Sequence, residues 1–139
     1  MKSYFDTAIL IYALEKGSAQ ARNLLERSMR EGMVGISVIT IMEYCTGCIR
    51  HNRQDMMTRF RHFLRNCDFE IHLIQEDTAF TAAKIRADYP AFKQMDALQL
   101  ASAITAEADV FYTNDKQLLQ FIHDRMKVVG VDMVSKSVQ

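Results

Sequence analysis

Short runs rich in β-branched and aromatic residues alternate along the chain with longer stretches that carry apolar residues at helical spacing. The runs typical of strands occupy residues 2–5, 34–38, 69–74, 110–113 and 127–131. The stretches typical of helices occupy residues 8–15, 19–30, 39–50, 56–66, 78–88, 97–108 and 116–122. Because strands that alternate with helices favour βαβ units, the pattern predicts an α/β protein. A mostly parallel sheet would lie between two layers of helices, as a three-layer α/β/α sandwich.

Few residues interrupt this pattern. The chain has one proline and five glycines, and it contains no repeat and no low-complexity stretch. Gly17, Gly32 and Gly130 fall at the ends of predicted elements, where glycine serves turns and helix C-caps. The 139 residues therefore predict a single domain over residues 1–139.

Composition excludes several classes of protein. Lysine and arginine number 17, as do aspartate and glutamate, so the formal net charge of +0 excludes a globally basic nucleic-acid binder but not a local basic patch. No apolar run approaches the roughly 18 residues that a membrane helix needs, which predicts that the protein does not enter a membrane. Asp6 interrupts the apolar stretch near the first residue, so we expect no secretory signal. Three cysteines cannot all pair within one chain, and we expect a reduced, cytoplasmic protein.

Acidic side chains follow two of the predicted strands. Asp6 comes directly after the first strand, and Asp115 comes shortly after the fourth. In parallel sheets the ligand crevice lies beyond the carboxyl ends of the strands, where the strand order reverses. Each aspartate alone is explained by helix capping, because aspartate accepts hydrogen bonds from the first free amides of a helix. Two of them at one edge of a sheet favour a functional site.

Two further acids lie on predicted helices. Asp96 stands in a first turn, off the centre of the apolar stripe, where the helix dipole also favours an acid. Glu43 falls in the middle of a helix, at the edge of its apolar stripe, and Gly47 follows one turn later at a cost of about 1 kcal/mol relative to alanine. An acid beside a bare stretch of helix suggests the floor of a groove, although a solvated glutamate explains it equally well. The stripe expected beside Glu43 consists of Ile39, Met42, Cys45 and Ile49; the stripe expected beside Asp96 consists of Ala97, Leu98, Ala101, Ile104 and Ala108.

Four converging carboxylates would need a counter-charge. Two carboxylates 4 Å apart repel by about 4 kcal/mol at an effective dielectric constant of 20. Such a cluster must share protons or hold a cation. Oxygen ligands suit Mg²⁺ or Mn²⁺, and a site of this kind supports hydrolysis of phosphodiester bonds.

Four motifs occur in a fixed order along the chain. They are Asp6-Thr7 after a strand, Glu43 with Gly47, the segment 93–103 (KQMDALQLASA), and Thr113-Asn114-Asp115. In this order they resemble a PIN domain, and more narrowly the single-domain VapC toxins of prokaryotic toxin–antitoxin modules, from residue 2 to about residue 131. The resemblance implies a five-stranded parallel sheet in which the first and fourth strands are neighbours.

The same resemblance implies a Mg²⁺- or Mn²⁺-dependent endoribonuclease that cleaves single-stranded or loop RNA. It implies Asp6 and Asp96 as direct metal ligands, with Glu43 and Asp115 completing the acidic, metal-binding pocket. It further implies a cognate antitoxin as partner and a symmetric homodimer. The residues expected to support the carboxylates are Thr7, Thr113 and Asn114.

Arginines cluster in the second half of the predicted helical pair between the second and third strands. Residues 50–66 hold five arginines against the single acid Asp55, and a local cluster of this kind is what a neutral nuclease needs for phosphate contact. A solvated helix flank is the alternative interpretation, and the wide apolar face of the same pair would also fit a helix of an antitoxin. The candidates for nucleic-acid or partner contact are Arg50, Arg53, Arg61 and Arg65.

Other chemistries find less support in the sequence. Cys45 and Cys48 form a C-x-x-C motif with His51 three residues later, but the motif falls late in a helix, which favours free thiols over a redox or zinc site. A receiver domain needs paired acids after the first strand, and a dehalogenase-type phosphatase needs an acid where Ala8 stands. A catalytically inactive PIN-fold module that binds nucleic acid or protein remains the alternative to an enzyme.

Overall fold

Five parallel strands form the centre of the protein, which is described here for residues 1–131 of a computed structural model. The strand order is β3-β2-β1-β4-β5, and every neighbouring pair is parallel. The five-stranded parallel sheet and the adjacency of the first and fourth strands are thereby confirmed. The strands are β1 (Lys2–Phe5), β2 (Met33–Ser37), β3 (Glu70–His72), β4 (Val110–Tyr112) and β5 (Lys127–Val129).

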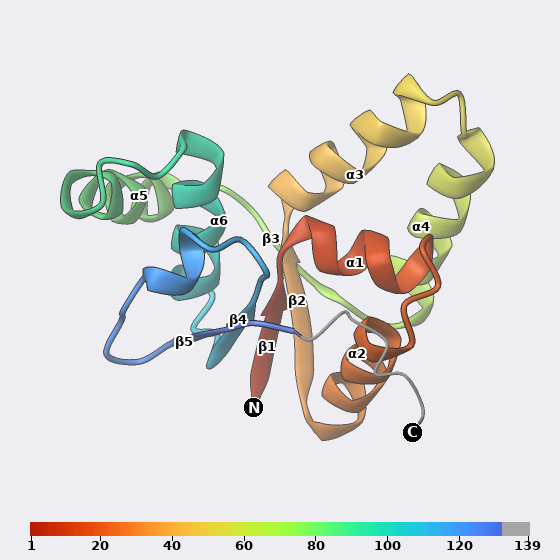
Figure 1. Ribbon diagram of the computed structural model, residues 1–139, viewed down its shortest axis with the longest axis horizontal. Coiled ribbons are helices and arrows are strands. Elements are labelled where there is room, and N and C mark those ends of the chain that lie inside the picture. Colours follow the sequence, from red (N-terminus) through yellow and green to blue (C-terminus); the bar gives the residue numbers. More distant parts are fainter. Residues whose placement is uncertain (132–139) are drawn as a thin grey trace.

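Helices cover both faces of the sheet, which confirms the three-layer α/β/α arrangement (Figure 1). One face carries α1 (Thr7–Leu14), α2 (Ala19–Glu31), α3 (Val38–Arg50) and α4 (Gln54–Asn66). The other carries α5 (Glu76–Asp88), α6 (Gln94–Thr105) and the 3₁₀ turn η1 (Leu118–Gln120). None of the helices in residues 1–131 has the length and apolar character that crossing a membrane requires.

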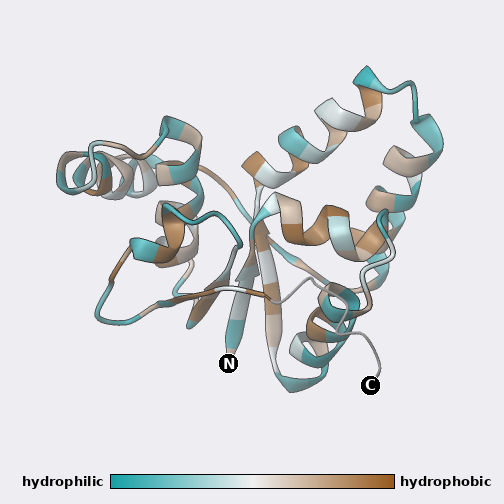
Figure 2. Ribbon diagram, in the orientation of Figure 1, coloured by the Kyte–Doolittle hydropathy of each residue, from teal (hydrophilic) through white to brown (hydrophobic). Residues whose placement is uncertain are grey.

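Side chains that alternate along the central strands build two separate cores. Phe5 packs with the α1–α4 layer, whereas Tyr4 and Phe111 pack with α5 and α6, as the two-residue period of a strand requires. Hydrophobic residues make up most of α1, which packs against α2 and α3, while α2 and α4 mix hydrophilic and hydrophobic residues along their length (Figure 2).

A polar contact ties the edge strand β3 to the central strand β1. Lys2 Nζ lies 3.0 Å from Glu70 Oε2, and the Tyr4 hydroxyl donates to Glu70 Oε1 at 3.0 Å. The Tyr4 ring passes over Gly35 of β2 on the way, and a Cβ atom at residue 35 would overlap that ring. A glycine is therefore required where one side chain must cross the neighbouring strand.

The apolar stripe expected on α3 is wrong in part. Met42 and Ile49 are 50% and 61% exposed, whereas Tyr44 and Cys48 are buried. Tyr44 stacks on Phe60 of α4 with ring centroids 3.9 Å apart, so the contact with α4 rotates the packed face away from the predicted one. The buried residues of α3 are Ile39, Thr40, Tyr44 and Cys48.

The stripe expected on α6 is too narrow, and the helix ends earlier than predicted. Glu107 adopts a left-handed backbone (φ 61°), and the Ala108 amide donates back to the Ala103 carbonyl at 2.9 Å, which ends the helix after Thr105. The helix is buried on several sides because it packs against α5, β2 and α3. Its buried residues are Ala97, Gln99, Leu100, Ala101, Ser102 and Ala103.

The helix expected over residues 116–122 is wrong, because only the 3₁₀ turn η1 forms there. Leu118 and Phe121 are both buried, and three residues per turn is the spacing that points both of them inward. Phe121 already has extended backbone, so the chain leaves the turn toward β5.

Candidate active site at the carboxyl edge of the sheet

Asp6 lies at the point where the strand order reverses, since the chain places β2 on one side of β1 and β4 on the other. The register pairs Phe5 with Tyr112, which sets Asp6 beside Thr113. The Thr113 hydroxyl donates to Asp6 Oδ2 at 2.7 Å, and the Thr7 amide donates to Asp6 Oδ1 at 2.8 Å. Asp6 is therefore the N-cap of α1 and also a carboxylate fixed on both oxygens at the ligand crevice of the sheet.

Glu43 reaches the same edge from the middle of α3. The Thr7 hydroxyl donates to Glu43 Oε1 at 2.7 Å, and the Gln99 side-chain amide donates to the same oxygen at 3.1 Å. Thr7 thus contacts two acids, Asp6 through its amide and Glu43 through its hydroxyl. These bonds join α1, α3 and α6 at one place.

Two further polar residues at this site, Gln99 and Thr40, were not predicted from the sequence. Gln99 is only 3% exposed, and its amide nitrogen lies 2.9 Å from the Thr40 hydroxyl, which is itself fully buried. The available signal is a three-residue spacing of polar side chains on helices that are otherwise rich in apolar and small residues. The polar side chains at this spacing are Ser37, Thr40 and Glu43 on one segment and Asp96, Gln99 and Ser102 on the other.

The four acids influence one another electrostatically. Burial raises the pKa of Asp6 above its ordinary value; hydrogen bonds to its charged form oppose the rise, and the charges of Glu43 and Asp96 add to it. Burial also raises the pKa of Asp96, and the charge of Asp115 adds to the rise; Lys93 opposes it and Glu43 adds to it. The charge of Asp96 therefore interacts with the charges of Asp6, Glu43 and Asp115.

The segment after β4 positions Asp115 and also forms a hydrogen bond with the chain just after β5. Asp115 is exposed, its amide donates to the Thr113 hydroxyl at 3.1 Å, and its Oδ1 accepts from the Gln117 amide at 2.9 Å. Asn114 Oδ1 accepts from the Val131 amide at 2.7 Å. Asn114, which the resemblance implies as a support for the acids, thus holds the chain just after β5.

The donor set suits a hard divalent cation. Within residues 1–131 none of the four acids takes part in an ion pair, since the ion pairs there are Lys2–Glu70, Arg53–Asp55 and His123–Asp124. Asp6, Glu43 and Asp96 are half-buried, and partly buried carboxylates outside any ion pair favour binding of a cation. In the same part of the chain, no three His, Cys, Asp or Glu side chains are arranged to hold a metal ion. Mg²⁺ is commonly held by one or two carboxylates, with water and substrate phosphate as its other ligands, so the carboxylates fit this ion without a closed cage.

The arginines of the α3–α4 pair differ in what they contact. Arg53 is exposed and bonds Asp55 at 2.9 Å, which neutralises its charge locally. Arg50, Arg61 and Arg65 are also exposed, and in the part of the chain that is described no ion pair involves them.

Cys45, Cys48 and Cys67 are free cysteines. Burial raises the pKa of the Cys45 thiol and of the Cys48 thiol. Since the thiolate is the reactive form of cysteine, these raised pKa values disfavour redox chemistry at the C-x-x-C motif.

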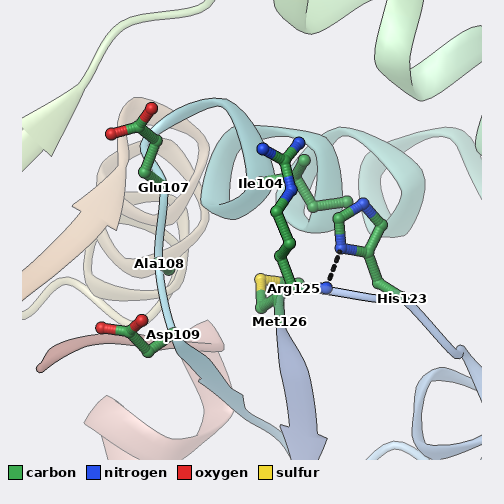
Figure 3. Close-up of a pocket in the computed structure, with 7 residues that line it drawn as sticks. All are labelled: Ile104, Glu107, Ala108, Asp109, His123, Arg125 and Met126. Atoms are coloured by element: carbon green, nitrogen blue, oxygen red, sulfur yellow. Dashed lines mark hydrogen bonds between the residues drawn. The ribbon is translucent and has the colours of Figure 1, made fainter.

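A cavity of about 370 Å³ lies away from the four acids of the candidate site (Figure 3). Its lining includes Asp109 and Met126, which precede β4 and β5, so it borders the amino ends of these strands. Inside it the Arg125 amide donates to His123 Nδ1 at 3.2 Å. Because the acids follow the carboxyl ends of the strands, this cavity is not part of the candidate site.

Comparisons with known proteins agree with the fold. A profile of the PIN domain matches residues 3–122. The fold is similar to VapBC2 from Rickettsia felis bound to a promoter DNA fragment, with a TM-score of 0.81, 20% sequence identity, and coverage of 95% of this chain and 100% of that chain. It is also similar to a toxin–antitoxin complex from Klebsiella pneumoniae, with a TM-score of 0.72, 29% sequence identity, and coverage of 89% of this chain and 94% of that chain. A third similar structure is DNA-bound VapBC from Salmonella typhimurium, with a TM-score of 0.78, 17% sequence identity, and coverage of 94% of this chain and 98% of that chain. No curated protein matches the chain.

Proposed function

The chain belongs to the PIN domain family, and from that premise we propose that it is a Mg²⁺- or Mn²⁺-dependent endoribonuclease, the toxin of a VapBC-type toxin–antitoxin pair. PIN domains are in general nucleases, which makes hydrolysis of a phosphodiester bond the reaction class to test. The observation that carries the proposal is the arrangement beside the strand-order reversal: Asp6 and Glu43 are both held by Thr7, and Asp96 and Asp115 follow at the same edge of the sheet, with none of the four acids in an ion pair within residues 1–131.

The four acids would divide into two pairs in the proposed reaction. Asp6 and Asp96 would hold the metal ion, with Asp6 oriented by the Thr113 hydroxyl and the Thr7 amide. Glu43 and Asp115 would complete the metal-binding pocket, and Glu43 would in addition orient the attacking water. A bound Mg²⁺ or Mn²⁺ would supply a water of lowered pKa and neutralise the charge that develops on the scissile phosphate.

RNA would reach the acids along the exposed arginines of the α3–α4 pair. Arg50, Arg61 and Arg65 are the candidates for phosphate contact, because their charges are not paired within residues 1–131. Arg53 would contribute less, since Asp55 already binds its guanidinium. We propose a single-stranded or loop substrate, whose backbone bends into the site more readily than a duplex does.

The proposed partners follow from the same relationship. The 29%-identical structure from Klebsiella pneumoniae is a toxin–antitoxin complex, which supports a cognate antitoxin as partner of this chain. We further propose that residues 1–139 act as one domain, in the cytoplasm, as a symmetric homodimer.

RNA cleavage by the purified protein tests the proposal. Single-stranded RNA is incubated with Mg²⁺ or Mn²⁺, with EDTA, and with the variant Asp96→Asn. The matched control is Asp124→Asn, which also replaces an aspartate by its amide but lies before β5, at the opposite edge of the sheet. We expect cleavage by the wild-type protein and by Asp124→Asn, and none with EDTA or with Asp96→Asn.

Full cleavage in EDTA, or by folded Asp96→Asn, contradicts the proposed mechanism. Wild-type protein that neither cleaves RNA nor binds Mn²⁺ in calorimetry contradicts the enzyme as well. That second result would favour the inactive binding module instead.

A further inference from the structure

A ladder of polar pairs joins α3 to α6 on the side that leads to the acids. The Ser102 hydroxyl lies 3.3 Å from the Ser37 hydroxyl, and the Gln99 amide lies 2.9 Å from the Thr40 hydroxyl. The second pair is reached by moving three residues forward from Ser37 and three residues back from Ser102. The two segments therefore run antiparallel along this ladder, and the spacing is that of neighbouring positions on a helix face.

The next step of three residues along each helix ends at two acids of the candidate site. It leads from Thr40 to Glu43 on α3 and from Gln99 to Asp96 on α6. The charge of Glu43 contributes to the raised pKa of Asp96, as expected of neighbours. Gln99 is thus the last uncharged residue of the ladder on α6 before the carboxylates.

The hydrogen atoms available at Gln99 determine where its bonds go. A side-chain amide has two N–H groups, and three acceptors surround this one: Thr40 Oγ1 at 2.9 Å, Glu43 Oε1 at 3.1 Å and Thr7 Oγ1 at 3.3 Å. The Thr7 hydroxyl donates its own hydrogen to Glu43 at 2.7 Å. The two N–H groups therefore serve the two nearer acceptors, Thr40 and Glu43.

We infer that Gln99 is a positioning residue of the proposed nuclease: it holds the Glu43 carboxylate by Oε1 and leaves Oε2 free for the reaction. This inference rests on the proposed function. In residues 1–131 both hydrogen bonds to the Glu43 side chain end on Oε1, so they fix the rotation of the carboxylate group. Thr40 holds the amide in turn, since Gln99 is 3% exposed and has little access to water.

Packing alone does not require an amide at residue 99. Leucine occupies a similar volume and has no polar group of its own to satisfy between two helices, and the buried Thr40 hydroxyl would keep its contact with the Thr7 hydroxyl at 3.2 Å. Asparagine would be too short to reach from α6 to Glu43 with the same backbone. What the glutamine adds is a donor that reaches across the helix interface to a carboxylate.

Three variants of the full-length protein test the inference. Gln99→Glu keeps the size of the side chain but replaces the donor by an acceptor that repels Glu43. Gln99→Leu removes the donor and suits the buried position, so it keeps the test decisive if Gln99→Glu does not fold. Ser102→Ala is the matched control, because it removes a buried hydrogen bond of the same ladder, one step further from the acids.

The measurements are Mn²⁺ affinity by calorimetry, kcat and KM on RNA, and thermal unfolding in EDTA. For both Gln99 variants we expect Mn²⁺ affinity and kcat to fall about tenfold or more, the usual effect of losing a partner of a metal ligand, with KM for RNA within about twofold of wild type. Ser102→Ala should unfold at a lower temperature while its Mn²⁺ affinity and kcat stay at the wild-type values.

Folded Gln99 variants with wild-type Mn²⁺ affinity and kcat overturn the inference and leave the nuclease proposal intact. An equal loss of Mn²⁺ affinity in Ser102→Ala also overturns it, because the effect would then come from general disturbance of the helix interface. Wild-type protein that neither binds Mn²⁺ nor cleaves RNA overturns the proposed function and this inference together.

Discussion

Asp6 has two roles whose energetic demands conflict. As the N-cap of α1 it stabilises the fold by accepting the Thr7 amide. Asp6 is also a half-buried carboxylate near Glu43 and Asp96, and burial and these like charges raise its pKa. Its ionised form therefore lowers the stability of the fold at neutral pH. Such a conflict is typical of sites that trade stability for function, and binding of a cation would remove it.

The substitution Asp6→Asn separates these two roles. Asparagine is as good an N-cap as aspartate, so we expect the metal-free variant to be at least as stable as wild type at neutral pH. Cleavage should fall by more than the ~10–100-fold that losing an outer partner of a metal ligand costs. Thermal unfolding in EDTA and RNA cleavage are the measurements.

The pH dependence of the free energy of unfolding, compared between wild type and Asp6→Asn, gives an independent check. A raised pKa in the folded state means that protonated Asp6 contributes stability that is fully present below the unfolded-state pKa of about 3.9 and is lost as pH rises through the folded-state pKa. The advantage of Asp6→Asn should therefore be present at neutral pH and disappear toward pH ~4. A variant that is clearly less stable than wild type at pH 7 would show that the cap, and not the charge, dominates.

Helix boundaries and packed faces were predicted with unequal success. The five strands and six of the seven helices occur near their expected positions, because hydrophobic periodicity reports burial directly. The α3 stripe was wrong because the stacking of Tyr44 on Phe60 belongs to the pairing with α4, and no pattern within α3 encodes it. The prediction of a helix over residues 116–122 was wrong because the chain leaves the 3₁₀ turn at Phe121 with extended backbone and runs on to β5, which begins at Lys127.

Gly47 gives a prediction at the scale of the element. It lies inside α3, where a Cβ atom would meet nothing within 4 Å. Glycine within a helix costs about 0.5–1 kcal/mol relative to alanine, so Gly47→Ala should raise the free energy of unfolding by that amount. Chemical denaturation measures it, and a lower free energy of unfolding would mean that the surface beside Glu43 is not open.

At the scale of the whole molecule, the four acids and a group of arginines lie near one edge of the sheet although the formal net charge is +0. The four acids lie beyond the carboxyl ends of the strands, and Arg50, Arg61 and Arg65, which form no ion pair within residues 1–131, lie on the α3–α4 pair that extends from that edge (Figure 1). Under the proposed function, this local separation of charge would let a protein without net charge attract RNA to one side.

Salt dependence of RNA binding tests that separation. Replacing Arg61 and Arg65 by alanine should raise KM. It should also flatten the plot of log K against log salt concentration by about 0.7 for each phosphate of single-stranded RNA that the variant no longer neutralises. The control is Arg22→Ala, an exposed arginine on α2. An unchanged slope in the double variant would place the RNA elsewhere on the surface.

The sequence by itself determined the α/β class and the order of the elements, and it singled out four acids as candidates for the site. Periodicity and strand-end position are local properties of the chain; each acid alone has a local explanation, and their combination and the order of the motifs singled them out. The resemblance to PIN domains implied a five-stranded parallel sheet with the first and fourth strands adjacent, which the structure confirms.

Only the tertiary structure decided which side chains meet. Thr113 donates to Asp6 across 107 positions of the sequence, and Gln99 donates to Glu43 across 56, because parallel strands and antiparallel helices bring distant segments into register. Gln99 illustrates the difference: in the sequence it is one polar residue in an apolar helix, and the contact with α3 gives it an acceptor. Hydrogen bonds of this kind depend on distances and angles that are set by packing of whole layers, which no local pattern specifies.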